Sequence, residues 1–265
     1  MKKVKLSISN IAWDGSQDGK VYELMIWYGY SGLEIAPTRI FPEAPYSKNT
    51  EAKIWSKNLK EQYGLVIPSM QSIWFRRKEN IFGTSEERKG LLDYTKMAIK
   101  FAEAIGCTNL VFGCPRNRNI PDDVSYDIGV RFFKELGDYA AEHNTVIGME
   151  ANPPLYNTNY INDTESAFEL IRMVNSKGFL LNLDVGTMIQ NEEDVNELEG
   201  KVGLINHVHI SEPNLKPIKE RKLHKDLKKV LENESYTGFV SIEMGKTDDL
   251  QLIERRLDYV RSIFI

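Results

Sequence analysis

Short apolar runs recur along the chain and alternate with longer amphipathic segments. The four clearest amphipathic segments, within 86–106, 127–143, 164–178 and 224–238, carry apolar residues at three-and-four spacing and end near Gly or Asn, which predicts helices. Eight apolar runs predict strands: KLSIS (5–9), GLEIAP (32–37), LVIPSM (65–70), NLVFG (109–113), TVIGME (145–150), FLLNLD (179–184), INHVHI (205–210) and GFVSIE (238–243). Strands that alternate with helices indicate a parallel sheet.

Eight strand–helix units in a chain of 265 residues predict an α/β fold, a (β/α)8 TIM barrel that forms a single domain over residues 1–265. An open doubly wound sheet is the alternative. No GxGxxG or P-loop sequence follows any of the runs, so a nucleotide-binding sheet lacks its main signal. In a barrel, the chemistry is expected at the C-terminal ends of the strands.

Composition narrows the classes of partner. Apolar residues make up 42% of the chain and charged residues 27%, which is typical of a globular protein. The net charge of −4, without a dense Lys/Arg block, gives no reason to expect nucleic acid and favours a small-molecule substrate. Two cysteines, Cys107 and Cys114, suggest a reducing compartment. Without an apolar leader or a membrane-length apolar stretch, we expect a cytoplasmic protein with no membrane partner.

Four consecutive runs end in polar residues that could share one site: Glu150, Asp184, His209 and Glu243. Strand alternation allows all four to point inward, with His207 one layer below His209. Carboxylates this close would repel one another unless protons or a cation were present. Oxygen ligands with one imidazole suit Mn²⁺ or Mg²⁺, while Co²⁺ or Zn²⁺ stays open. Taken singly, each residue could instead be a helix cap or a buried hydrogen-bonded group.

These residues stand in the contexts GMEANPP, LDVG, HVHISEP and VSIEMG, and the chain resembles the xylose isomerase-like TIM barrel superfamily, closest to its sugar phosphate isomerase/epimerase group. GLEIAP, PSMQSIWF and VFGCPRNR extend the similarity. The resemblance implies one divalent ion, most readily Mn²⁺, bound by Glu150, Asp184, His209 and Glu243. It also implies that Glu150 and Glu243 are catalytic and exchange protons with a small carbohydrate from opposite sides.

The implied reaction is proton abstraction beside a carbonyl, with a metal-stabilised enediolate. Two glutamates on opposite faces would favour epimerisation, whereas one carboxylate moving the proton would interconvert an aldose and a ketose. Dehydration, as in inosose dehydratase relatives, starts in the same way. The sequence does not choose among these, nor between a free and a phosphorylated sugar.

Other residues near the strand ends are candidates for substrate binding. Arg116 and Arg118 could hold a phosphate or carboxylate, or form a solvated loop. Sugar sites combine polar groups with aromatic walls. Further candidates are Glu34, Gln71, Trp74, Thr187 and Glu212, although Trp74 could equally be a packing residue. His143 receives no role, and His224 could reach the site only if the preceding loop folds inward.

Two departures from the resemblance bear on activity. Thr187 stands where many relatives carry a substrate-contacting histidine, and Tyr156 where some 3-epimerases carry a glutamate. A barrel that binds a sugar or metal without catalysis is therefore a competing hypothesis. An apurinic endonuclease is disfavoured because its three-zinc cluster needs many histidines and this chain has four. A homo-oligomer is also expected from the resemblance.

Overall fold

The computed structural model describes residues 4–265, so the first three residues of the predicted domain lie outside it. Within the described residues there are seven strands: β1 (Lys5–Ser9), β2 (Gly32–Glu34), β3 (Leu110–Phe112), β4 (Ile147–Met149), β5 (Phe179–Asp184), β6 (Ile205–Ile210) and β7 (Phe239–Ile242). All pair in parallel, in the order β2-β1-β7-β6-β5-β4-β3.

Segment 65–70 closes the sheet between β2 and β3. Isolated bridges join Gly32 to Val66, and Met70 to both Ile35 and Leu110. The prediction of a regular strand over 65–70 is therefore wrong, because only isolated bridges form there. The segment nevertheless lies where the prediction places it, between β2 and β3. Pro68 at its centre has no N–H to donate, which prevents a continuous ladder. The molecule is a (β/α)8 barrel, as predicted.

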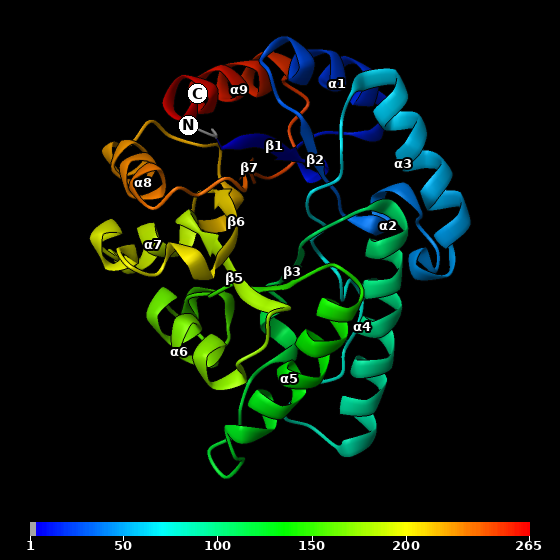
Figure 1. The fold of residues 1–265 in the computed structure, drawn as a ribbon, viewed down its shortest axis with the longest axis vertical. Coiled ribbons are helices and arrows are strands. Elements are labelled where there is room, and N and C mark those ends of the chain that lie inside the picture. The colour runs from blue at the N-terminus through cyan, green and yellow to red at the C-terminus, as the bar shows by residue number, and fades with distance from the viewer. Residues whose placement is uncertain (1–3) are drawn as a thin grey trace.

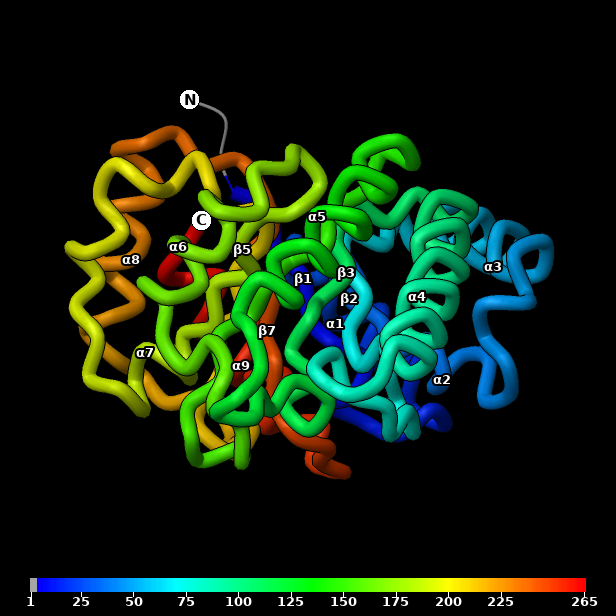
Figure 2. Tube along the Cα trace, turned by 90° about the horizontal axis from the view of Figure 1, so that it is seen from below, coloured from blue at the N-terminus to red at the C-terminus, as the bar shows by residue number. Residues whose placement is uncertain are grey.

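Nine α-helices of the described chain surround the strands (Figure 1). They are α1 (Asp18–Trp27), α2 (Pro37–Ile40), α3 (Asn49–Tyr63), α4 (Ser85–Ile105), α5 (Asp127–Glu142), α6 (Thr164–Val174), α7 (Val185–Asn191), α8 (Lys222–Asn233) and α9 (Leu250–Phe264). The pair α3 and α4 lies on the opposite side of the strands from α7 and α8 (Figure 2). None of the helices between residues 4 and 265 is both long and apolar enough to cross a membrane.

The four helices predicted from periodicity are confirmed as α4, α5, α6 and α8. Their ends follow local capping. In α4 the Thr84 hydroxyl accepts from the Glu87 N–H while the Glu87 carboxylate accepts from the Thr84 N–H, and Gly106, with φ of 71°, caps the C-terminal end. These caps set where the helix stops and the next strand begins.

The barrel interior is polar where it faces the C-terminal strand ends. Buried polar side chains that include Ser7, Asn109, Asn182, His207 and Ser241 alternate with apolar residues packed against the helices. Strand alternation thus turns apolar residues toward the helices and these polar residues toward the inside of the barrel. The inward groups form the floor beneath the candidate site.

Candidate active site

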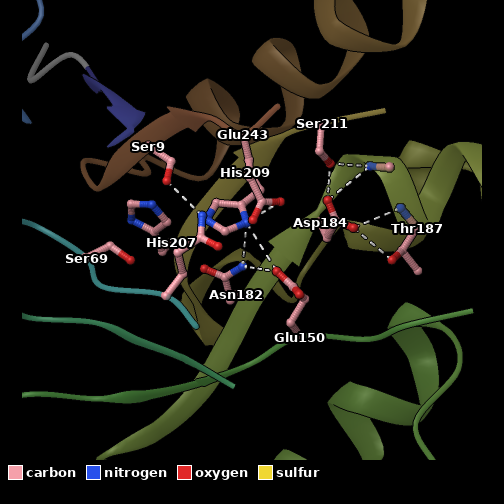
Figure 3. A network of polar contacts seen from close by, with 12 residues as sticks. Ser9, Ser69, Glu150, Asn182, Asp184, Thr187, His207, His209, Ser211 and Glu243 are labelled. Atoms are coloured by element: carbon pink, nitrogen blue, oxygen red, sulfur yellow. Dashed lines mark hydrogen bonds and ion pairs between the residues drawn. The ribbon is translucent and has the colours of Figure 1, made fainter. Parts of the chain in front are cut away.

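The C-terminal ends of β4 to β7 bring their polar residues around one pocket. Glu150 follows β4, Asp184 ends β5, and Glu243 follows β7; all three line a pocket of about 200 Å³. His209, inside β6, is fully buried directly behind the carboxylates (Figure 3). The structure therefore brings all four predicted ligand residues to the same end of the barrel.

Glu150, His209 and Glu243 form one of two close groups of potential ligands; the other is Glu34, His207 and His209. The Nδ1 of His209 lies 3.1 Å from Oε1 of Glu150 and 3.3 Å from Oε2 of Glu243. The potential ligand atoms of these three residues lie within 4.8 Å of one another. Gly113 makes room for this arrangement, since a Cβ there would approach Oε2 of Glu150 to 2.7 Å. Two carboxylates thus approach the same imidazole nitrogen from different strands.

The other nitrogen of His209 faces a buried carboxylate. Its Nε2 lies 2.8 Å from Oε2 of Glu34, which also lies 3.3 Å from Nε2 of His207. Burial alone would raise the pKa of Glu34, but His209 and His207 outweigh it and hold that pKa well below its usual value. Burial likewise opposes the charge of His209, yet Glu34 and Glu243 raise its pKa well above the usual value. Burial lowers the pKa of His207 despite Glu34.

Two carboxylates at the pocket, those of Glu243 and Asp184, have raised pKa values. Burial, opposed by His209 and reinforced by Glu150, raises the pKa of Glu243 to about 7. Burial and the nearby Glu150 raise the pKa of Asp184 to about 6. Such shifts mark a site with more negative charge than its surroundings neutralise. A cation would remove this penalty.

Asp184 is held differently from the other predicted ligands. Its carboxylate accepts hydrogen bonds from the Ser211 hydroxyl and from the backbone N–H groups of Gly186 and Thr187. The Thr187 hydroxyl also donates to it, at 2.9 Å. Asp184 does not belong to the compact ligand group of Glu150, His209 and Glu243. Its role as a ligand stays a prediction.

The donor set fits a divalent cation. Two carboxylates and an imidazole are ligands for Mn²⁺, Co²⁺ or Zn²⁺. When His209 donates from Nε2 to Glu34, its Nδ1 carries the lone pair, on the side of Glu150 and Glu243. A carboxylate that accepts from the far nitrogen of a ligating histidine fixes the tautomer and strengthens the ligand.

The predicted substrate-binding residues divide into those at the pocket and those below it. Gln71 and Glu212 line the pocket. The amide of Gln71 donates to Ser9 and to Glu34, while Arg221 pairs with the Glu212 carboxylate. Glu34 itself is fully buried beneath the pocket, so the structure gives it a contact with the histidines rather than with solvent.

Three further candidates also lie away from the carboxylates. Arg118 is fully buried and donates to the carbonyl of Glu150 at 2.9 Å, so it supports the end of β4. The indole of Trp74 donates to Thr95 and its ring packs in the core. Arg116 is exposed and, like Trp74, lines a neighbouring cavity.

Thr187 is buried and bonded, so it does not simply replace a substrate-contacting histidine. Its hydroxyl donates to the carbonyl of Ala151 at 2.8 Å as well as to Asp184. Of the remaining histidines, His143 pairs with Glu103 at the surface, and His224 is buried with its Nδ1 2.9 Å from the Tyr259 hydroxyl. Neither lines the pocket.

Sequence reasoning missed several polar residues of the site. The amide of Asn182 lies 2.9 Å from Oε1 of Glu150 and 3.3 Å from Nδ1 of His209. Asn152 donates to the other Glu150 oxygen at 3.3 Å. Asn182 precedes Asp184 by two residues and therefore shares its strand face, so the sequence did indicate that Asn182 points inward. Ser211 stands two residues after His209 and continues the same alternation just past the end of β6.

Comparisons with known proteins agree with this architecture. The sequence profile described as "Xylose isomerase-like TIM barrel" matches residues 26–263. The chain belongs to this family. No curated protein matches the sequence at a significant level.

Solved structures of the family share its fold at low sequence identity. The 3-keto-D-glucoside 4-epimerase of E. coli has 19% identity and a TM-score of 0.76, with 98% of this chain and 100% of that chain covered. The D-psicose 3-epimerase of Clostridium cellulolyticum H10, solved with D-tagatose, has 14% identity and a TM-score of 0.77, covering 98% and 99%. A family 2 AP endonuclease of Brucella melitensis has 18% identity and a TM-score of 0.72, covering 98% and 96%.

Proposed function

We propose that the protein is a metal-dependent isomerase or epimerase of a small carbohydrate, acting by proton transfer beside a carbonyl. One observation carries the proposal: Glu150 and Glu243 line the same pocket and both contact Nδ1 of His209, although β5 and β6 separate their strands. The names of the similar structures, mostly sugar epimerases, support the same class of reaction.

Glu150, His209 and Glu243 would hold the ion, with Asp184 as the fourth predicted ligand. When bound, a divalent cation would polarise a substrate carbonyl and stabilise negative charge on its oxygen. Glu34 orients His209 from behind, and Asn182 fixes Glu150 through its amide. Glu150 and Glu243 are the two carboxylates that both contact His209 and line the pocket.

The two glutamates divide the proton transfer between them. One carboxylate takes the proton from the carbon beside the carbonyl, and the other returns a proton. Because they reach the pocket from β4 and β7, on either side of β5 and β6, they are suited to opposite faces of the carbon. This arrangement favours epimerisation over the single-base shift of an aldose–ketose isomerase.

The test is incorporation of solvent deuterium into free and phosphorylated ketoses, measured by NMR with Mn²⁺-loaded protein. We expect metal-dependent incorporation that falls at least about a hundredfold in Glu150→Gln and in Glu243→Gln. Glu61→Gln, an exposed change on α3, is the matched control and should retain full exchange. Near-full exchange in either pocket variant would rule out that glutamate as a proton carrier, and no exchange with any ketose would reject the proposal.

A further inference from the structure

A second cavity adjoins the carboxylate-lined pocket. It measures about 800 Å³ and shares Ser72, Cys114 and Pro115 with the first pocket. Its walls come from two loops, 72–78 after the segment that closes the barrel and 114–117 after β3. The two cavities therefore adjoin, with these three residues forming the wall between them.

The second cavity is basic. Arg76, Arg77, Lys78 and Arg116 line it, and its lining contains no acidic side chain. Arg77 is neutralised by an ion pair with Glu79. The side chains of Arg76, Lys78 and Arg116 have no ion-pair partner among residues 4–265, and all three residues are exposed. Three cationic groups are thus available to a ligand.

The charges of the two cavities are opposite. Four carboxylates, those of Glu150, Asp184, Glu212 and Glu243, line the first pocket. A cation bound there would offset part of that negative charge but would leave the basic wall on the other side unchanged. A ligand that spans both cavities is oriented when one of its ends is anionic.

The backbone holds Arg76 in a conformation that favours glycine. Its φ is 67° in a turn closed by the Arg77 N–H donating to the Trp74 carbonyl at 2.9 Å. The third position of a turn with positive φ is usually Gly or Asn, and another side chain there is strained. The Arg76 guanidinium lies over the Phe75 ring, 5.2 Å from its centre, at the wall of the cavity. Strain of this kind often accompanies ligand binding.

We propose that the second cavity binds an anionic group, a phosphate or a carboxylate, at the end of the substrate remote from the reacting carbonyl. This inference rests on the proposed function, because it assigns the carbonyl end of the same molecule to the carboxylate-lined pocket. Guanidinium groups recognise the oxygens of phosphate and carboxylate through paired hydrogen bonds, and Lys78 adds a mobile point charge. The substrate is then an anionic sugar rather than a free ketose.

Matched ketoses test the proposal through binding. Titration calorimetry on Mn²⁺-loaded protein compares fructose, fructose 6-phosphate and a ketose acid of similar length. We expect at least one anionic sugar to bind about tenfold or more tightly than fructose, and the stronger of the two identifies the anion. Equal binding of all three would overturn the proposal.

Variants locate the binding in the second cavity. Arg116→Gln and Lys78→Gln should each weaken binding of the preferred anionic sugar about tenfold and leave fructose binding unchanged. Lys57→Gln, which removes an exposed charge on α3, is the control. Unchanged binding of the anionic sugar in both cavity variants would contradict the assignment.

Arg76→Gly separates binding from folding. Glycine relieves the left-handed backbone, so the melting temperature should stay the same or rise while binding of the anionic sugar falls. A purely structural role for Arg76 predicts the opposite: a lower melting temperature with binding retained.

Inorganic phosphate provides a readout independent of turnover. Phosphate should bind the chelator-treated protein, and Arg116→Gln should weaken that binding. Phosphate binding that requires Mn²⁺ would place the anion at the carboxylates and overturn the inference. Failure of deuterium exchange would reject the proposed function. The phosphate measurement would still test whether the second cavity binds an anion, because it does not depend on turnover.

Discussion

Glu34→Gln probes how the site prepares His209. The carboxylate of Glu34 lies 2.8 Å from Nε2 of His209 and both side chains are fully buried, so water cannot replace the lost charge. The amide oxygen of glutamine can still accept the hydrogen bond, and the change therefore removes charge more than shape. Loss of such a partner typically weakens metal binding 10- to 100-fold, about 1.4–2.7 kcal/mol.

The assay is competition for Mn²⁺ with a fluorescent chelator, read as a function of pH. At pH 8 we expect the 10- to 100-fold loss of Mn²⁺ affinity. The negative charge of Glu34 attracts a doubly charged ion at His209 more strongly than it attracts a proton there, so its removal weakens metal binding more than proton binding. The acid limb of binding should also move to lower pH, since Glu34 raises the pKa of His209. Glu61→Gln is the charge-matched control. Wild-type affinity and an unmoved acid limb in folded Glu34→Gln would refute the reasoning.

Three further predictions follow from the same contacts. Mn²⁺ affinity should fall as pH drops from 8 to 5, because the raised pKa values of Glu243, about 7, and Asp184, about 6, let protons compete with the ion. Titration calorimetry of Mn²⁺ binding in buffers of different ionisation enthalpy should detect the protons that the ion displaces. Thr187→Val removes the hydroxyl that donates a hydrogen bond to Asp184, and it should lower the free energy of unfolding by about 1–3 kcal/mol in urea titrations. Arg118→Met removes the buried donor to the Glu150 carbonyl and should cost about 2–4 kcal/mol in the same assay, whereas an unchanged midpoint would show that this support is dispensable.

Local patterns were enough to predict much of the barrel. Apolar runs and three-and-four spacing are properties of neighbouring residues, so they predicted the strand positions and four of the helices, α4, α5, α6 and α8. The segment 65–70 failed as a regular strand because Pro68 lacks an N–H, a signal that was present in the sequence. The inward set of Glu150, His209 and Glu243 followed from strand alternation together with the resemblance.

Contacts between distant segments could not be predicted in this way. Arg118 is buried because carbonyls of Glu150 and Ile161, 32 and 43 residues away, converge on its guanidinium. Glu34 contacts His209, which lies 175 residues away in the sequence, and does not point into the pocket. The left-handed backbone of Arg76 likewise depends on a turn that the sequence does not mark with glycine.

The proposed chemistry depends on a divalent-metal site formed by Glu150, His209 and Glu243 at the pocket. Crystals grown with Mn²⁺ and measured at its absorption edge test this directly. We expect one strong anomalous peak within bonding distance of both carboxylates and of Nδ1 of His209. No peak at these residues, with Mn²⁺ in excess near pH 8, would contradict it.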